Sequence, residues 1–258
     1  MPRLIAGLLC TLMLCYGMAA AGASPDLARE ARLRHEIIDA IFEGKPIDLP
    51  VGDHSVLAID MAPAGDAKGA VILAHGRGLH PNWDAVIQPL RIGLANDGWR
   101  TVSVQMPVLE KSAKYNDYAP VFPHAIERLD AALAYLRADG VNRIAVLAHS
   151  CGFHMTNHWL LNRPDRRIDA LIAIGAGATH YRQPQQEPFV FPQLNIPILD
   201  VYGEHDYPAV LRKAALRHSG LRHPQSAQIV VADSDHDHTE NDDALLTVVA
   251  DWLRTLNP

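Results

Sequence analysis

From about residue 55 onward, short apolar runs alternate with longer segments in which apolar residues recur at helical spacing. Several short runs are almost continuous in Val, Ile, Leu and Ala, which is typical of strands covered on both faces. The predicted strands are 56–61, 70–74, 101–105, 143–148, 170–174, 198–202 and 228–231, and the predicted helices are 83–96, 124–138, 152–162, 209–217 and 242–256. Strand alternating with helix predicts the α/β class, with a mostly parallel central sheet flanked by helices.

The segment before this alternation has its own pattern. Residues 25–44 carry apolar positions at helical spacing and end at Gly44, a helix stop. We therefore predict that residues 24–54 form a helical segment packed on a main domain of residues 55–258. No internal repeat or linker indicates a second domain.

The first residues, MPRLIAGLLCTLMLCYGMAAAGAS, contain one positive charge, an apolar run and then small residues. This order predicts a signal peptide of residues 1–23, cleaved before Ser24. The apolar run is short for a membrane span, which argues against an uncleaved anchor. Cleavage removes Arg3 from 23 basic residues, leaving 22 against 29 acidic ones and a net charge of −7. We therefore expect an exported protein, periplasmic or secreted, with no stable membrane span after cleavage.

Composition limits the classes of partner. With 48% hydrophobic and 20% charged residues in 258, the chain can bury a sizeable core. A formal net charge of −6 gives no reason to expect nucleic acid or an anionic membrane surface as partner. Two of the three cysteines lie in the predicted signal, so the mature chain keeps only Cys151 and cannot form an internal disulfide.

A candidate nucleophile lies at the break in RIAVLAHSCGFH, residues 143–154. Ser150 ends a predicted buried strand and opens a predicted helix, where a sharp turn would hold its hydroxyl outward. Such a turn needs small residues two positions before and after the serine, and Ala148 and Gly152 are both small. Ala148 replaces the usual first glycine of G-x-S-x-G, which adds one methyl group to the turn.

A serine hydroxyl needs a base, and the base needs an acid to orient it. The strand in IPILDVYGEHDY is followed by Asp206, our predicted acid, with Glu204 as the competing carboxylate. The strand in AQIVVADSDHDHTE is followed by His236, our predicted base, with His238 as the alternative. The order Ser, Asp, His at the carboxyl ends of predicted strands is the order expected for this fold.

Two backbone amides are candidates for an oxyanion hole. The turn would direct the amide of Cys151 at the reacting oxygen. The loop in VILAHGRGLHPNW offers the amide of Arg77, with that of Gly78 as the alternative, because glycines let the backbone turn toward a substrate. We expect His75 to be structural, and His149 to be structural or to line the pocket.

Four segments carry a family resemblance. VILAHGRG, VLAHSCG, YGEHD and ADSDHDH, in this order and spacing, resemble the α/β-hydrolase superfamily over about residues 55–258. More narrowly, HGRGLHPNW followed by DGWRTVSVQMP is similar to an uncharacterised group of exported bacterial α/β-hydrolase-like proteins. The superfamily resemblance implies hydrolysis through an acyl-enzyme on Ser150. The narrower resemblance implies no particular substrate.

Two long Pro-rich segments, 107–122 and 176–195, interrupt the alternation and are typical of lids or binding walls. Their aromatic residues are predicted pocket residues, with capping of the sheet edge as the alternative: Tyr115, Tyr118, Phe122, Tyr181, Phe189 and Phe191.

The sequence argues against a metal site and against a cysteine nucleophile. His154 and His158 lie one helical turn apart but lack the glutamate of H-E-x-x-H, so we predict no metal. Cys151 as nucleophile, as in the dienelactone hydrolases of this fold, would put His149 and Phe153 where the turn needs small residues.

The sequence therefore predicts a cofactor-free serine hydrolase, carboxylesterase-like, that acts on a small-molecule acyl substrate. Ser150, Asp206 and His236 would form its catalytic triad. A peptidase or thioesterase with the same triad, and a non-catalytic exported binding protein that kept the fold, are the alternatives.

Overall fold

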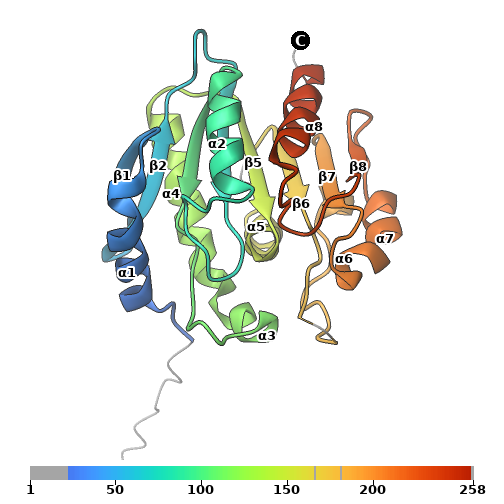
Figure 1. The fold of residues 1–258 in the computed structure, drawn as a ribbon, viewed down its shortest axis with the longest axis horizontal. Helices are drawn as coiled ribbons and strands as arrows, with labels where there is room; N and C mark the ends of the chain where they lie inside the picture. Colours follow the sequence, from blue (N-terminus) through green and yellow to red (C-terminus); the bar gives the residue numbers. More distant parts are fainter. Residues whose placement is uncertain (1–22, 166, 181, 257–258) are drawn as a thin grey trace, which may run out of the picture.

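The computed structural model describes residues 23–165, 167–180 and 182–256. Within these residues eight strands form one sheet in the order β1-β2-β4-β3-β5-β6-β7-β8 (Figure 1). β1 and β2 pair antiparallel with each other, as do β2 and β4, and every other neighbouring pair is parallel. The strands are β1 Lys45–Val51, β2 His54–Met61, β3 Gly69–Ala74, β4 Trp99–Val104, β5 Ile144–His149, β6 Ala170–Ile174, β7 Ile198–Gly203 and β8 Ala227–Val231.

Helices cover both faces of this sheet (Figure 1). One apolar cluster joins the sheet to α2 and α8, and a second joins its other face to α4 and α5. The α-helices are α1 Leu27–Ile37, α2 Ile87–Asn96, α3 Tyr115–Tyr118, α4 Phe122–Ala138, α5 Cys151–Asn162, α6 Pro208–Arg212, α7 Ala214–Ser219 and α8 Asp242–Thr255. Three short 3-10 helices are also present in the described residues: η1 Ile38–Ala40, η2 Ala119–Val121 and η3 Phe191–Gln193.

The predicted α/β architecture is confirmed, and the reason is visible in the central strands. Every residue of β5 and β6 is buried, as the continuous apolar runs predicted. Because β3, β5, β6, β7 and β8 run parallel, their carboxyl ends meet at one edge of the sheet, together with the loops that follow them.

The N-terminal segment differs from its prediction. The helix is shorter than residues 25–44, because α1 ends at Ile37 and η1 follows it. Residues 45–51 form the edge strand β1, which the sequence analysis missed. Pro46 and Pro50 are tolerated there, since an edge strand has one side without a ladder partner.

Two predicted helices differ from the structure by more than a shift of one or two residues at an end. The helix predicted at 83–96 starts only at Ile87, after Val86 with φ of 55°. The helix predicted at 209–217 is divided at Lys213 into α6 and α7.

The predicted signal peptide lies outside the described residues, except for its last residue, Ala23. In the part of the chain that the structure describes, no helix combines the length and the apolar character that a membrane crossing requires.

A buried ion pair holds α1 on the body of the protein. The Arg128 guanidinium of α4 lies 3.0 Å from the Glu30 carboxylate and also donates to the carbonyl of Gln105. Glu30 accepts a further bond from the amide of Val108. Burial raises the pKa of Glu30, and the neighbouring charge of Arg128 opposes that rise. The pair thus joins α1, α4 and the segment after β4.

We predict that Glu30→Gln lowers the free energy of unfolding by about 3 kcal/mol, because it leaves the buried Arg128 without its counter-charge. Urea denaturation of both proteins measures the difference. Glu36→Gln, an exposed position on the same helix, serves as the control and should change stability by less than about 0.5 kcal/mol. Equal stability of Glu30→Gln and the unmodified protein would contradict the role of the pair.

Candidate active site

Ser150 lies on a strained turn between β5 and α5. Its backbone has φ of 57° and ψ of −119°, outside the regions that non-glycine residues favour. Its amide donates to the carbonyl of Ile174 at 2.9 Å, which fixes the turn against β6. A strained backbone of this kind costs about 1–3 kcal/mol and persists only where the surroundings enforce it.

The surroundings of the turn explain its small residues. A Cβ atom at Gly152 would lie 2.4 Å from the carbonyl oxygens of both Ala74 and His75, so no side chain fits there. Ala148 pairs with Ala74 on one neighbouring strand and with Ala173 on the other. The methyl group that replaces the usual glycine hydrogen therefore has small neighbours on both sides.

Ser150, His236 and Asp206 form a continuous chain of hydrogen bonds. His236 Nε2 lies 2.8 Å from Ser150 Oγ, and His236 Nδ1 lies 2.6 Å from Asp206 Oδ1. The carboxylate accepts from Nδ1–H, which leaves the Nε2 lone pair to accept from the serine hydroxyl. The imidazole is thus in the tautomer and position of a general base for Ser150.

The competing acid and base lie elsewhere. Glu204 is exposed and accepts a bond from the amide of Asp233 at 3.1 Å. His238 is fully buried, and its Nδ1 lies 2.8 Å from Ser234 Oγ. The structure brings Asp206 and His236, rather than these two residues, to Ser150.

Three neighbours hold the His236 ring. The Tyr207 ring stacks on it with 4.0 Å between centroids and an interplanar angle of 23°. His149 Nε2 lies 3.0 Å from the His236 carbonyl, so its N–H donates to the backbone of the base. Gly175 lies on the remaining side, where a Cβ would be 2.7 Å from His236 Cε1. Burial holds the pKa of His149 well below its usual value, with the nearby His236 as a further cause.

The loop after β3 is held by a neutral histidine. His75 Nδ1 donates to the carbonyl of Gly76 at 2.8 Å, and Nε2 accepts the amide of Met106 at 2.9 Å. Burial lowers the pKa of His75 to about 3. The ring therefore stays neutral, which its role as acceptor requires, and it is structural as predicted.

Helix α1 supports the same loop from outside. Arg29 donates to the carbonyl of Gly78 at 3.0 Å and also to the carbonyl of Leu109. On the other side of Ser150, Cys151 is the first residue of α5, so its amide has no acceptor within the helix. Arg77 and Cys151, whose amides are the predicted oxyanion donors, both line the cavity around Ser150.

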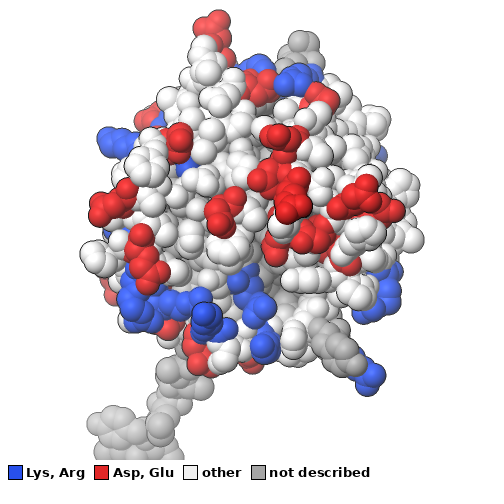
Figure 2. Space-filling model, viewed as in Figure 1, with Lys and Arg blue, Asp and Glu red and all other residues white. Residues whose placement is uncertain are grey.

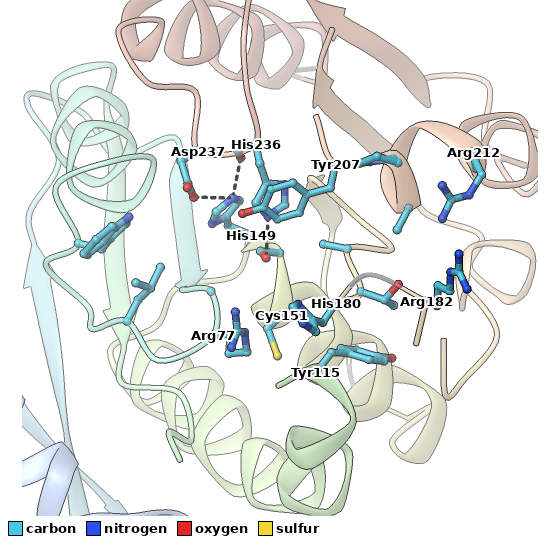
Figure 3. Close-up of a pocket in the computed structure, with 18 residues that line it drawn as sticks. Arg77, Tyr115, His149, Cys151, His180, Arg182, Tyr207, Arg212, His236 and Asp237 are labelled. Atoms are coloured by element: carbon cyan, nitrogen blue, oxygen red, sulfur yellow. Dashed lines mark hydrogen bonds and ion pairs between the residues drawn. The ribbon is translucent and has the colours of Figure 1, made fainter. Parts of the chain in front are cut away.

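A cavity of about 860 Å³ is lined by Ser150, Cys151 and His236 (Figure 3). Two of the predicted pocket residues, Tyr115 and His149, line it. The other described lining residues, besides those already named at the turn and the triad, come from four loops and α6: Gly76, Leu79, Trp83, Ala178, Thr179, His180, Arg182, Tyr207, Pro208, Ala209, Arg212 and Asp237.

Four of the predicted pocket aromatics do not line the cavity. Tyr118 is buried under the loops, where its hydroxyl accepts the amide of Leu109 at 2.9 Å. Phe122 is buried beside the His154 and His158 rings. Phe189 packs on Phe153 and Phe191 in the core, so Phe191 is a core residue as well. Tyr181 lies outside the described residues. Aromatic residues in these loops mostly complete the core, because burial of their large apolar surface is favourable wherever the sheet leaves room.

The two long segments contact each other and form one wall of the cavity. The amide of Gln186 donates to the Tyr115 hydroxyl at 3.1 Å, and the amide of Asn116 donates to Gln183 Oε1 at 3.1 Å. From α5, His154 Nε2 donates to the carbonyl of Ala178 at 2.8 Å. Burial lowers the pKa of His154 to about 3, so this ring is neutral as well.

The candidate metal ligands have other partners. His149, His236 and Asp237 bring ligand atoms within 4.8 Å of one another, but both nitrogens of His236 already bond Asp206 and Ser150. A second group of close ligand atoms, Glu204, His205 and Asp233, lies exposed on the surface. Of the helical pair, His154 bonds a carbonyl and His158 lies 2.6 Å from Glu187.

Sequence reasoning missed Tyr207, Arg182 and Arg212 as cavity residues. Tyr207 directly follows the predicted acid Asp206, so its place in the sequence could have identified it as a residue near the site. The two arginines carry no such signal, because a polar loop and a short helix expose arginines in most proteins.

A family model described as "Protein of unknown function (DUF3530)" matches residues 48–121 and 122–255. The chain belongs to this family. No curated protein matches the sequence.

Solved structures of α/β hydrolases share the fold of this DUF3530 protein. An α/β serine hydrolase homologue from Coxiella burnetii is 18% identical, with a TM-score of 0.63 over 84% of this chain and 99% of that one. Dienelactone hydrolase from Anabaena variabilis is 16% identical, with a TM-score of 0.65 over 83% and 97%. XC6422 from Xanthomonas campestris, an α/β serine hydrolase without a lid, is 15% identical, with a TM-score of 0.61 over 84% and 96%. At these identities the likeness establishes the fold alone.

We predict that Cys151 of the native protein resists alkylation. Burial raises the pKa of its thiol to about 12, from an ordinary value of 9.0. At pH 8 this lowers the thiolate fraction about 1,000-fold relative to the unfolded chain. Iodoacetamide treatment with and without urea, followed by peptide mapping of Cys151, measures the ratio. Equally fast alkylation of the folded protein would restore Cys151 as a candidate nucleophile.

We also predict that His154 makes the fold sensitive to acid. At about pH 5 the unfolded chain protonates this ring and the folded protein does not, so the free energy of unfolding falls as the pH drops below about 6.5. His154→Gln removes this contribution. Between pH 7 and pH 5 the variant should therefore lose about 2 kcal/mol less stability than the unmodified protein. Urea denaturation at the two pH values tests this, and an unchanged pH dependence in the variant would contradict it.

Proposed function

We propose that this protein is a serine hydrolase, carboxylesterase-like, that cleaves a carboxylic ester or related acyl bond through an acyl-enzyme on Ser150. The observation that carries the proposal is the hydrogen-bonded chain from Ser150 through His236 to Asp206, with distances of 2.8 and 2.6 Å. Its position at the carboxyl ends of the parallel strands, next to a cavity that can hold a small molecule, supports the same assignment.

In the proposed reaction Ser150 Oγ attacks the carbonyl carbon while its proton passes to His236 Nε2. Asp206 stabilises the imidazolium that forms and keeps the ring in place. The imidazolium then returns the proton to the leaving group as the acyl bond breaks. A water molecule, activated by the same imidazole, attacks the acyl-enzyme and releases the acid.

The negative oxygen of the tetrahedral intermediate would lie between the amides of Cys151 and Arg77. The Cys151 amide is suited to this because the first amides of a helix lack acceptors and carry the positive end of its dipole. The neutral ring of His75 and the side chain of Arg29 support the loop that presents the Arg77 amide. The loss of one such donor typically costs about 3–4 kcal/mol in the transition state.

We further propose that the protein is exported, periplasmic or secreted, with a small-molecule acyl substrate as its partner. The order of charge, apolar run and small residues in the first 23 residues supports export. The same triad serves peptidases and thioesterases, so substrate screening should include peptide and thioester bonds.

The first test is labelling of the purified protein with a fluorophosphonate, followed by intact mass and peptide mapping. The proposal predicts one adduct, on Ser150, that is absent from Ser150→Ala and His236→Ala. His205→Ala, which removes an exposed imidazole beside Asp206, is the matched control and should label normally. Absence of an adduct from the folded protein would contradict the enzyme proposal and favour a binding protein that kept the fold.

Ester hydrolysis then gives the size of each contribution. For any ester that the protein hydrolyses, Ser150→Ala and His236→Ala should each lower kcat by roughly 10,000-fold or more, because the two groups act as a unit. Asp206→Asn should also lower kcat strongly, because the amide favours the wrong imidazole tautomer. A variant that lacks both Ser150 and His236 should be no worse than either single variant, and additive losses would contradict their joint action.

A further inference from the structure

The cavity is more basic than the rest of this acidic protein. Among the described residues that line it, three are arginines, Arg77, Arg182 and Arg212, and Asp237 is the one carboxylate outside the triad. The whole chain has a net charge of −6, so this concentration of positive charge runs against the average. Figure 2 shows several basic side chains gathered in the lower part of this face, beside a hollow, with most of the acidic side chains above them.

The positive charge is concentrated at one end of the cavity. Arg182 comes from the loop after β6 and Arg212 from the last residue of α6, yet both lie on the same side of the cavity, across from Asp237 (Figure 3). Two arginines from separate elements at one end can bind an anionic oxygen group from two directions, since each presents a fork of N–H donors.

The buried carboxylate beneath α6 and α7 is already paired. Asp200 is fully buried and accepts two bonds from Arg217 at 2.8 Å each. Lys213, next to Arg212, donates to the carbonyl of Gly177. Burial lowers the pKa of Lys213 to about 8, with the charges of Arg217 and Arg212 as further causes. Within the described residues the side chain of Arg212 has no hydrogen bond or ion pair.

Arg77 adds a third charge near the nucleophile. Its guanidinium donates to the carbonyl of Ala113 and forms no ion pair with a carboxylate of the described residues. It lines the same cavity as Ser150, Cys151 and Tyr207. A substrate that reaches Ser150 therefore enters a cavity lined by three arginines and one carboxylate, that of Asp237.

We propose that Arg182 and Arg212 form a subsite for an anionic oxygen group of the substrate, and that the substrate is an ester with a free carboxylate some bonds away from the scissile carbonyl. This inference rests on the proposed function and adds the substrate class. The triad performs the hydrolysis, and the arginines orient the ester and raise its local concentration.

The test compares two esters that differ by one methyl group: the 4-nitrophenyl hemiester of glutaric acid and its methyl ester. The free carboxylate should raise kcat/KM at least about 10-fold over the methylated compound, and added salt should reduce that ratio. Arg212→Gln and Arg182→Gln should each lower the ratio about 5-fold or more, mainly through KM. Arg222→Gln, an exposed arginine remote from the cavity lining, is the matched control and should keep it.

Direct binding separates this inference from the proposed function. Glutarate and inorganic phosphate are titrated by calorimetry into the unmodified protein, Ser150→Ala and Arg212→Gln. Glutarate binding that survives Ser150→Ala and weakens about 5-fold or more in Arg212→Gln supports the subsite even if no ester is hydrolysed. Tighter phosphate binding with the same dependence on Arg212 supports the subsite and identifies a phosphoryl group as its ligand.

Two results would overturn the subsite. One is equal kcat/KM for the two esters in a protein whose Ser150 takes the fluorophosphonate, which leaves the hydrolase proposal intact. The other is anion binding that is absent, or unchanged in Arg212→Gln.

Discussion

The site depends on the close approach of two pieces of backbone at residue 152. The start of α5 lies so close to the end of β3 that only a hydrogen atom fits where a Cβ would be. This contact forces the sharp turn before the helix, and the turn places Ser150 in a backbone conformation that an open loop would not keep. The position of the hydroxyl, the free amide of Cys151 and the distance to His236 all follow from it.

Burial keeps the supporting histidines neutral. His75, His149, His154 and His238 all have a pKa below the ordinary value, with burial as the largest cause in each case. The first three bond a backbone carbonyl of a loop that surrounds the cavity, and His238 bonds the hydroxyl of Ser234. A histidine-rich sequence is therefore no sign of a metal centre here. A neutral imidazole can donate a hydrogen bond from one ring nitrogen and accept one at the other. These histidines therefore hold neighbouring backbone segments in place.

Local sequence patterns predicted most strands and helices. They did not predict the features that depend on contacts between residues far apart in the chain. Apolar runs of four to six residues predicted seven of the eight described strands, because strands covered on both faces are largely apolar. Edge strand β1 has two prolines and no such run, so its pairing with β2 could not be read from local pattern. Ser150, Asp206 and His236 could be selected because chain order and strand ends restrict the choice. The aromatic residues of the loops could not be assigned, since a Phe in the core and a Phe in a pocket look alike in sequence.

The contacts of helix α1 affect the order in which parts of the protein can fold. The residues of the DUF3530 match begin at 48, yet Arg29 on α1 holds Gly78 and Leu109, and Glu30 meets Arg128, 98 residues further along the chain. Helix α1, the first helix of the described residues, thus lacks the partner of its buried ion pair until α4 has been synthesised. Closing so long a loop costs entropy before any contact forms, so such contacts assemble late. A chain that has folded its sheet but not yet docked α1 would hold the triad residues while the loop beside Ser150 still lacks its outer support.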